Sequence, residues 1–571
     1  MAPYLMRDAF FGRVVYHLSG KRLFNHPEER PDYVIPERYL GQTSQISVIE
    51  KKQNPDNIDS DDTNLQLERT RTRQSSVSNP EASGASGGEG SEKGEEDNNG
   101  EILVDWEGDD DPENPKNWPI WRKAFVIVMV GLLTVSIYMG SSIYIPGEIE
   151  MTEDFGISIV VATLPLSLFV LGYGLGPMVF SPLSEHPAVG RTYIYIITLF
   201  IFVILQIPTA LAKNIGSLLV LRFLAGFFAS PALATGGASV GDVLPMPWMP
   251  VGLATWGIFA VGGPTLGPLL GGVFAQLLSW RWTFWFLLIL DGTVLLVLFF
   301  FLPETSQETL LYRRAKRLRK LTGNDKIVSN GDKTIARMTP KEVAIETLWR
   351  PLAIAFGEPV IFFINIYIGL MYALMYMWFE AFPMVLNGLY HMNNIEMGVS
   401  YLSIWIGVVI GWALYSPVVH RKFTIPLLNG TMVNPEVFLG PAAIGAVIQP
   451  IGVFIFAWSS TASAHWIGPL IGSALFAVGA FIVFQTLFNY MGMSFYRFQA
   501  SVFAGNGLFR ASMAAGFPLF ARAMYTHLGP SKYPVGWGCS LLAFFLVGMI
   551  AIPVVLKLKG DKLRARSKYA N

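Results

Sequence analysis

Long runs nearly free of Asp, Glu, Lys and Arg alternate with shorter charged segments along most of the chain. A helix needs about 20 predominantly apolar residues to cross the hydrocarbon core of a bilayer, so each long run predicts a membrane-spanning helix. The run 437–496 is too long for one helix and is divided by its polar turn 459–463. The predicted spans lie within residues 124–147, 155–184, 192–212, 214–241, 243–280, 282–303, 359–379, 397–420, the two parts of 437–496, 498–521 and 535–556. The pattern predicts an all-α integral membrane protein with twelve transmembrane helices.

A charged stretch between the sixth and seventh spans divides the predicted helices into two sets of six. The second and eighth helices end with the same spacing, G-x3-G-x4-S-P, which suggests an internal repeat. The repeated positions are Gly172, Gly176, Ser181 and Pro182, and Gly407, Gly411, Ser416 and Pro417. Two related six-helix halves with the substrate site between them are a transporter architecture. We therefore expect two pseudo-symmetric bundles, at residues 120–303 and 353–557.

The segments outside the bundles differ in composition. Residues 1–40 contain several apolar positions and leave two interpretations open, an amphipathic helix on the inner leaflet or a partly ordered tail without a lipid role. Residues 41–115 are rich in Ser, Asn, Gly and Glu and are predicted to be disordered. Residues 304–352 are predicted to form a linker whose basic run 313–320 suits an anionic leaflet. Residues 558–571 are predicted to be a C-terminal tail.

The distribution of Lys and Arg predicts the orientation of the chain in the membrane. If the N-terminus is cytosolic, the outer loops hold Lys213, Arg281, Arg522 and Lys532. The inner loops, the linker and the C-terminal tail then hold the larger share of the basic residues. We expect both termini to be cytosolic.

Composition excludes several classes of function. Charged residues make up 15% of the chain, against about 25% in soluble domains. The net charge of zero gives no indication of nucleic-acid binding, and the single cysteine, Cys539, excludes an intrachain disulfide. The sequence has no GxxxxGK[ST] phosphate loop, so we expect no ATP binding. It has no HExxH, and its two GxSxG sequences, around Ser86 and Ser239, lack the strand–turn–helix setting of a nucleophile elbow. We expect neither an enzyme nor a metal site.

Two short sequences at the ends of spans carry a recognisable pattern. The segment after helix two contains an acid and a base on a tight loop, which can lock neighbouring helix ends. Its marked residues are Ser181, Pro182, Glu185, Gly190 and Arg191. Helix five carries G-x3-G-P-x2-G-G, in which the glycines let helices pack closely and the proline bends the span. Its marked residues are Gly263, Gly267, Pro268, Gly271 and Gly272.

These sequences, with the entry segment 106–118, resemble the major facilitator superfamily and, within it, the fungal drug:proton antiporters with twelve spans. The resemblance extends from Val104 to the C-terminus and is strongest to the yeast benomyl and azole resistance permeases. It implies that the segment after helix two gates the transporter and that the helix-five sequence marks antiporters. The sequence departs from the family pattern where Glu185 replaces the usual Asp, where residues are inserted before Gly190, and where Ala254 replaces a glycine.

Charged residues inside the spans are candidates for proton coupling, since such residues are costly in a bilayer and face an interior cavity as a rule. The resemblance implies that Arg222 takes part in coupling, while the alternative is an arginine that caps the carbonyls of a broken helix. Glu380, near the end of helix seven, is a candidate proton carrier. Asp291, in the middle of helix six, is either a second proton site or a partner for a neighbouring polar group.

Polar and aromatic side chains form stripes on helices one and seven at helical spacing. Two residues of helix eleven match the Asn-x3-Arg pattern of the fungal group that the chain resembles. The candidates for substrate binding are Thr134, Tyr138, Ser141, Asn365, Tyr372, Tyr376, Asn506 and Arg510.

The resemblance implies export of diverse small organic compounds, such as azoles and benomyl-like or cycloheximide-like agents, across the plasma membrane by alternating access. Protons would be the coupling ion, and no cofactor is expected. The expected partners are drug-like substrates and membrane lipid, and a monomer suffices for such a bundle. Two alternatives stay open: an exporter of a physiological metabolite, such as a polyamine or organic acid, with incidental drug export, and a nutrient receptor built on the same fold.

Overall fold

The computed structural model describes residues 6–31, 33–39, 101–337, 339, 342, 345–530 and 532–570. The chain forms two units. The first, called the membrane unit, comprises Met1–Asn25, Trp106–Leu310 and Thr334–Asn571. The second, called the small unit, comprises His26–Asp105 and Leu311–Lys333.

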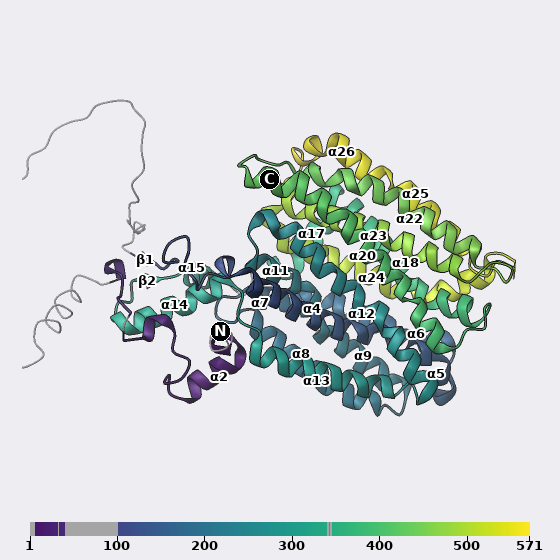
Figure 1. The fold of residues 1–571 in the computed structure, drawn as a ribbon, viewed down its shortest axis with the longest axis horizontal. Coiled ribbons are helices and arrows are strands. Elements are labelled where there is room, and N and C mark those ends of the chain that lie inside the picture. The colour runs from purple at the N-terminus through teal and green to yellow at the C-terminus, as the bar shows by residue number, and fades with distance from the viewer. Residues whose placement is uncertain are drawn as a thin grey trace, which may run out of the picture. The chain divides into compact units, whose positions relative to one another are not determined.

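The first half of the membrane unit is a set of helices between residues 120 and 301 (Figure 1). Several spans are divided into two helices where a proline or glycine interrupts them, as at Gly176 between α6 and α7. The helices are α4 (Ile120–Ser142), α5 (Glu148–Phe155), α6 (Ile159–Leu175), α7 (Pro177–Glu185), α8 (Arg191–Ala210), α9 (Ile215–Ala229), α10 (Pro231–Ala234), α11 (Gly236–Val243), α12 (Met249–Leu277) and α13 (Trp282–Phe301).

The second half repeats this organisation after residue 349 (Figure 1). Its helices are α17 (Arg350–Gly357), α18 (Pro359–Phe382), α19 (Asn394–Ser400), α20 (Leu402–Val419), α21 (Ile425–Leu428), α22 (Leu439–Ser459), α23 (Ile467–Ser494), α24 (Gln499–His527), α25 (Gly536–Met549) and α26 (Ala551–Arg564). The end of the membrane unit that carries α7 and α11 is called the near end, and the end that carries α5 is called the far end (Figure 1).

Eleven helical segments in the described part of the chain are long and apolar enough to cross a membrane. The twelfth predicted span corresponds to α24, which has 29 residues and is therefore long enough to cross. It is more polar than the others because it contains Asn506, Arg510 and Arg522. The predicted fold class, an all-α membrane protein with two six-helix halves, is confirmed.

The repeated glycines occupy equivalent positions in the two halves. A Cβ atom at Gly172 of α6 would meet the Phe223 carbonyl of α9, and one at Gly407 of α20 would meet the Ala474 carbonyl of α23. The second helix thus packs on the fourth, and the eighth on the tenth. Close backbone approach of this kind is how membrane helices associate without a hydrophobic driving force.

The N-terminal segment of the membrane unit contains helix α2 (Phe10–Leu18). The Phe10 ring lies 5.1 Å from the Tyr193 ring of α8 and 5.2 Å from the Phe299 ring of α13, centroid to centroid. Backbone pairing of Ala9 with Pro303 extends the same contact. This part of the N-terminal segment is therefore ordered against the first half.

The predicted disorder of residues 41–115 is wrong for residues 101–115. Strand β1 (Ile102–Leu103) begins there, and the buried Asp111 carboxylate accepts hydrogen bonds from the backbone N–H groups of Glu107 and Glu113 at 2.8 and 2.9 Å. Local capping by an aspartate orders a segment whose composition alone suggested disorder. Residues 41–100 lie outside the described residues.

The small unit contains the parallel pair β1 and β2 (Ile327–Val328), with Ile102 opposite Ile327. In the basic run of α14 (Gln307–Thr322), Arg314 and Arg317 each contact Glu28 at 3.1 Å. Arg319 binds Asp332, at the start of α15 (Asn330–Arg337), at 2.9 Å. The run that was expected to serve a lipid surface thus also has protein partners.

Two predicted boundaries fall inside helices. The expected linker end at residue 352 lies within α17, which starts at Arg350. The expected start of the C-terminal tail at residue 558 lies within α26, which continues to Arg564. Charged side chains mark the end of apolar composition in a sequence, whereas a helix continues for as long as its backbone hydrogen bonds do.

Candidate functional site

Four tyrosines and an arginine meet where the two halves face each other. Tyr138 of α4 and Tyr173 of α6 come from the first half, while Tyr372 and Tyr376 of α18 and Arg510 of α24 come from the second. The Tyr173 hydroxyl donates to the Tyr372 hydroxyl at 2.9 Å. Ring centroids are 5.2 Å apart for Tyr138 and Tyr173 and 5.1 Å apart for Tyr372 and Tyr376. We call these five residues the tyrosine cluster.

The tyrosine cluster contains polar atoms that could bind a substrate. The Tyr138 hydroxyl and Arg510 Nε are buried and have no hydrogen-bond partner among the described residues. The Arg510 guanidinium lies 5.1 Å from the centre of the Tyr372 ring, within the range of a cation–π contact. Buried polar atoms without partners are costly, so a ligand that satisfied them would gain affinity. Flat aromatic rings with a few polar groups match this chemistry.

Tyr173 belongs to this cluster but was not among the sequence candidates. It lies between Gly172 and Gly174, and a Cβ at Gly174 would meet Ala511 of α24. The two glycines let α6 approach α9 and α24, and this brings Tyr173 to the boundary between the halves. Its position directly after Gly172, the first glycine of the repeat, was the signal that could have found it.

A second group lies toward the far end and joins the two halves through a threonine. The Thr163 hydroxyl of α6 lies 3.0 Å from Glu148 Oε1 and 3.1 Å from Glu380 Oε1. Both carboxyl side chains are buried, and Arg522 of α24 is the base that acts electrostatically on both. Glu148 and Thr163 belong to the first half, and Glu380 of α18 to the second. We call Glu148, Thr163 and Glu380 the carboxyl chain.

Glu148 was missed because the first apolar run ends at Gly147, which made the acid look like the first residue of a loop. In the structure, a turn at Ile145–Gly147 redirects the backbone and Glu148 starts helix α5. An acid in the first turn of a helix is stabilised by the helix dipole. The turn brings the Glu148 side chain back into the protein, where it is 6% exposed.

Arg222 of α9 is buried and directs its hydrogen bonds to backbone carbonyls. It donates to the carbonyl oxygens of Gly140 at 2.7 Å, Ser141 at 3.0 Å and Pro165 at 3.3 Å. Gly140 and Ser141 lie in the last turn of α4, where carbonyls lack intrahelical donors. The geometry of a carbonyl cap, the alternative reading of this residue, is thus present. Among the described residues no ion pair joins Arg222 to an acid, and the Tyr144 ring lies 5.3 Å from its guanidinium.

Asp291 of α13 is fully buried and does not join the carboxyl chain. The hydroxyl of Ser136 in α4 lies beside the Asp291 carboxyl group. This acid therefore lies inside the first half, apart from Glu380.

Of four further sequence candidates, Thr134, Asn365 and Asn506 make their side-chain hydrogen bonds within one half, whereas Ser141 lies beside Tyr138 and Tyr376 of the tyrosine cluster. Thr134 accepts a hydrogen bond from Trp256 Nε1 at 3.1 Å, and Ser141 donates to the carbonyl of Tyr138 at 2.8 Å. The Asn506 amide donates to Asn365 Oδ1 at 2.9 Å and links α24 to α18. These contacts are internal to the helix packing of each half.

The glycines of α12 pack this helix against α4 and α19. A Cβ at Gly263 would lie 2.6 Å from Tyr138 Cβ, and one at Gly267 would lie 2.9 Å from the Met139 carbonyl oxygen. A Cβ at Gly271 would overlap the Ile143 carbonyl, and one at Gly272 would overlap the Asn394 carbonyl of the second half. Pro268 lies inside the same continuous helix. This surface leaves no room for side chains between α12 and its neighbours.

At the near end, the segment after helix two is organised differently from the expectation. Ser181, Pro182 and Glu185 lie in helix α7, so the loop starts only at residue 186. Arg191 binds Asp242 of α11 in a bidentate ion pair, with Nε–Oδ2 and Nη2–Oδ1 distances of 2.5 and 3.1 Å. Asp242 was missed, although it is the acid that ends the fourth apolar run. It is fixed further by the hydroxyl of Thr305 at 3.1 Å.

Gly190 and the residues beside it complete this network. Gly190 has a φ of 83°, in the left-handed region that favours glycine, and a Cβ there would meet the Glu304 carboxylate. Glu304 accepts a hydrogen bond from the Arg191 backbone N–H at 3.1 Å and lies 3.8 Å from the Arg13 guanidinium.

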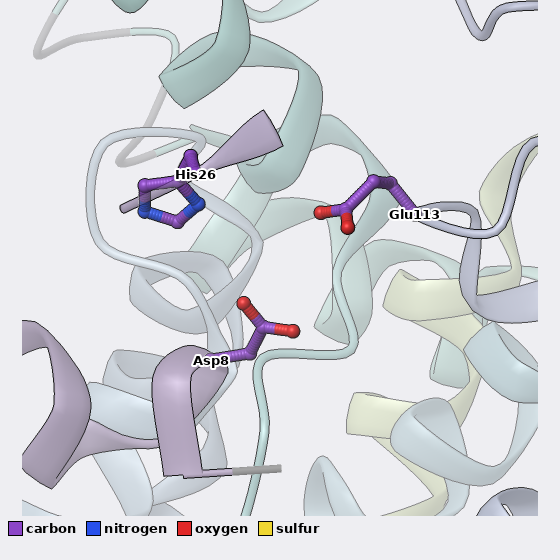
Figure 2. A group of neighbouring side chains, drawn as sticks. All are labelled: Asp8, His26 and Glu113. Atoms are coloured by element: carbon purple, nitrogen blue, oxygen red, sulfur yellow. The ribbon is translucent and has the colours of Figure 1, made fainter. Parts of the chain in front are cut away.

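A further set of ion pairs fixes the N-terminal segment. The carboxylates of Asp8 and Glu113, shown in Figure 2, both bind Arg7 at 2.8 Å. Arg122 also binds Asp8 at 3.1 Å. Burial disfavours the charged form of Arg7, but the two carboxylates outweigh this effect and raise the pKa of Arg7 above its ordinary value. Arg7 therefore keeps its charge at physiological pH.

The profile of the Major Facilitator Superfamily matches residues 130–518, more than half of the chain. The chain belongs to the Major Facilitator Superfamily. The resemblance inferred from the motifs is confirmed, and this superfamily consists of membrane transporters.

Several relatives in the superfamily carry names that refer to drug resistance. The chain is 51% identical over 577 residues to a Candida maltosa protein named Cycloheximide resistance protein, and the match covers 100% of both chains. It is 43% identical over 471 residues to the Saccharomyces cerevisiae Fluconazole resistance protein 1, which covers 82% of this chain and 85% of that protein. The solved structure of the human organic anion transporter MFSD10 matches with a TM-score of 0.52, and the match covers 77% of this chain and 100% of the MFSD10 chain. At 16% identity this match supports the fold alone.

Proposed function

We propose that the protein is a proton-coupled antiporter that exports structurally diverse small organic compounds across the plasma membrane by alternating access. The observation that carries the proposal is the position of the tyrosine cluster and the carboxyl chain. Both are built from residues of the two halves, and alternating access changes the contacts between such halves. Aromatic rings that could hold a substrate and a carboxyl that could hold a proton would therefore respond to the same motion.

The near end faces the cytosol in this proposal, and both termini are cytosolic. The distribution of Lys and Arg supports this orientation, because exposed bases such as Arg421 and Lys422 follow α20 at the near end. The far end, with the carboxyl chain, then faces the outside of the cell. A carboxyl there can receive a proton from the external medium.

The names of the relatives support a substrate range that includes cycloheximide-like and azole compounds. In the proposed mechanism the tyrosine cluster stacks on the flat parts of such molecules, and Arg510 contributes a cation to their polar groups. Protons are the coupling ion, and the protein uses neither a cofactor nor ATP.

Glu380 is the proposed carrier of the coupling proton. Arg222 holds the end of α4 in place through its hydrogen bonds to the Gly140 and Ser141 carbonyls, so its effect on coupling is positional. Asp291, a buried acid inside the first half, is proposed as a second protonation site.

The test is transport into inside-out membrane vesicles that contain the full chain. Labelled cycloheximide and fluconazole should accumulate when the lumen is acidic and should stop accumulating when nigericin collapses the pH gradient. Accumulation that survives nigericin would overturn proton coupling. Gradient-driven uptake of a polyamine or an organic acid, with none of the two drugs, would replace drug export by metabolite export.

A further inference from the structure

We infer that Glu148, Thr163 and Glu380 form a single shared-proton site that holds the far ends of the two halves together. The inference deepens the proposed function, since it rests on proton antiport and assigns the residues of the proton site. It adds Glu148 and Thr163 to Glu380 and gives the proton a mechanical role.

Thr163 has too few hydrogen atoms to donate to two ionised carboxylates. The Thr163 oxygen lies 3.0 Å from Glu148 Oε1, 3.1 Å from Glu380 Oε1 and 3.1 Å from the Ile159 carbonyl. A hydroxyl has one proton to donate and two lone pairs that accept. Two ionised carboxylates only accept, so one of the two contacts would then be repulsive. The arrangement is attractive when a protonated carboxyl donates to Thr163 and Thr163 donates to the other carboxylate.

The charged and titratable groups around the carboxyl chain also favour one bound proton. Arg522 and Tyr525 face it from α24, Tyr144 faces it from the turn after α4, and Tyr401 faces it from the start of α20. The three phenols are neutral at physiological pH. Arg522 supplies one positive charge, which compensates one carboxylate. The start of α5 only partly offsets the charge of Glu148, so a second buried carboxylate is not fully compensated, and like charges at short range disfavour joint ionisation. One proton therefore completes the charge balance as well as the hydrogen bonds.

The carboxyl chain lies across the boundary between the two halves. Glu148 and Thr163 move with the first half and Glu380 with the second, so the hydrogen bonds cross the boundary that alternating access opens. The packing of Gly272 against Asn394 closes the same end. Loss of the shared proton replaces a hydrogen bond by repulsion between carboxylates and favours separation of the halves there. Proton binding and opening of the far end are thus mutually opposed, which is the coupling that an antiporter needs.

The consequence for transport is a defined order of events. A proton from outside closes the far end after substrate release. Departure of that proton to the cytosolic side lets the substrate-loaded protein open outward. The proton passes through without any covalent change, so one proton moves inward for each opening of the far end.

The experiment measures the separation of the two halves at the far end without substrate. Spin labels are placed on Glu153→Cys of α5 and on Ala462→Cys, between α22 and α23, in the full chain with Cys539→Ala. Both positions are exposed. Pulsed electron paramagnetic resonance then reports the distance between labels in nanodiscs from mildly acidic to mildly alkaline pH. The parent should show one short distance at acidic pH and a growing population of longer distances as the pH rises.

The variants distinguish the shared proton from a structural contact. Glu148→Gln and Glu380→Gln replace an acceptor by an amide that donates permanently, so each should keep the short distance at every pH. Thr163→Val should shift the population toward long distances even at acidic pH, and Thr163→Ser, which keeps the hydroxyl, should restore the parent response. Glu358→Gln is the matched control, because Glu358 is a buried acid directly before α18 and outside the carboxyl chain, and it should leave the pH response unchanged.

Retention of the parent pH response by both Glu148→Gln and Glu380→Gln would overturn the inference, as would a parent that shows no pH response. Size-exclusion profiles identify a variant that fails to fold, and the remaining glutamine variant then decides. Because the distances need no substrate, failure of drug export to follow the pH gradient would contradict the proposed function while leaving this measurement intact.

Discussion

Acidic side chains have different surroundings at the two ends of the membrane unit. At the near end, Asp242 is bound by Arg191 in a bidentate ion pair, and both belong to the first half. At the far end, Glu148 and Glu380 share the hydroxyl of Thr163, and the contact crosses from one half to the other. Carboxylates paired with arginine keep their charge and hold the helices that carry them together. Buried carboxyls that share a neutral hydroxyl change their charge with protonation.

The acids at the near end thus stabilise one half, whereas those at the far end respond to protonation. Ion pairs within one half, such as that of Arg191, keep helix ends together while the half moves as a body. Hydrogen bonds between halves that depend on a proton can be made and broken during a transport cycle.

The largest effect is expected for Glu380→Gln. The amide cannot release a proton, so the far end should stay closed and export driven by the pH gradient should be abolished, while the protein still reaches the cell surface. Drug resistance of cells and vesicle transport measure the loss, and surface labelling measures the amount of protein. Glu153→Gln, which changes an exposed acid of α5, is the control and should transport normally. Normal resistance in Glu380→Gln would remove this residue from the coupling.

Arg222→Ala should also abolish export, with a loss of stability that Glu380→Gln does not show. The substitution leaves the carbonyls of Gly140, Ser141 and Pro165 without their donor, and each buried unsatisfied group costs about 1–3 kcal/mol. The midpoint of thermal unfolding in detergent should therefore fall. An unchanged midpoint together with lost export would point to a direct electrostatic role of Arg222 instead of the positional one.

Asp242→Asn should lower stability without changing the pH response of the far end. Loss of the charge-assisted pair leaves Arg191 half-buried and less well bound, at a cost of about 1–3 kcal/mol in the free energy of unfolding. Because Arg191 and Asp242 both lie in the first half, the spin-label distances across the far end should follow the parent curve. A shifted pH response in this variant would show that the near and far ends are coupled through the first half.

The smallest effect is expected for Tyr372→Phe. The change removes the hydroxyl that accepts from Tyr173 and keeps the ring that stacks on a substrate. A neutral hydrogen bond contributes about 0.5–1.5 kcal/mol, so the apparent affinity for a polar substrate should fall severalfold and that for an apolar one should change little. Transport at several substrate concentrations measures both values. Equal effects on all substrates would mean that the ring position itself had moved.

The helices and their grouping could be read from the sequence because each depends on local composition. An apolar run of sufficient length predicts a span whatever its neighbours in the chain are. The repeated glycines at Gly172 and Gly407 marked the two halves. The assignment to the superfamily depended on short motifs of the same local kind, such as Gly263 to Gly272. Disorder of residues 101–115 was predicted wrongly because composition does not register a capping residue such as Asp111.

The partners of the functional residues depended on the tertiary structure. Glu380 and Tyr372 were recognised as candidates on one stripe of one helix, but Glu148, Thr163 and Tyr173 come from other helices and were missed. Asp242 was missed as the partner of Arg191 for the same reason. Helical periodicity determines which residues share a face of one helix, whereas the packing of small residues between helices determines which faces meet. That packing brings two acids, more than 200 positions apart in the chain, to the same threonine hydroxyl.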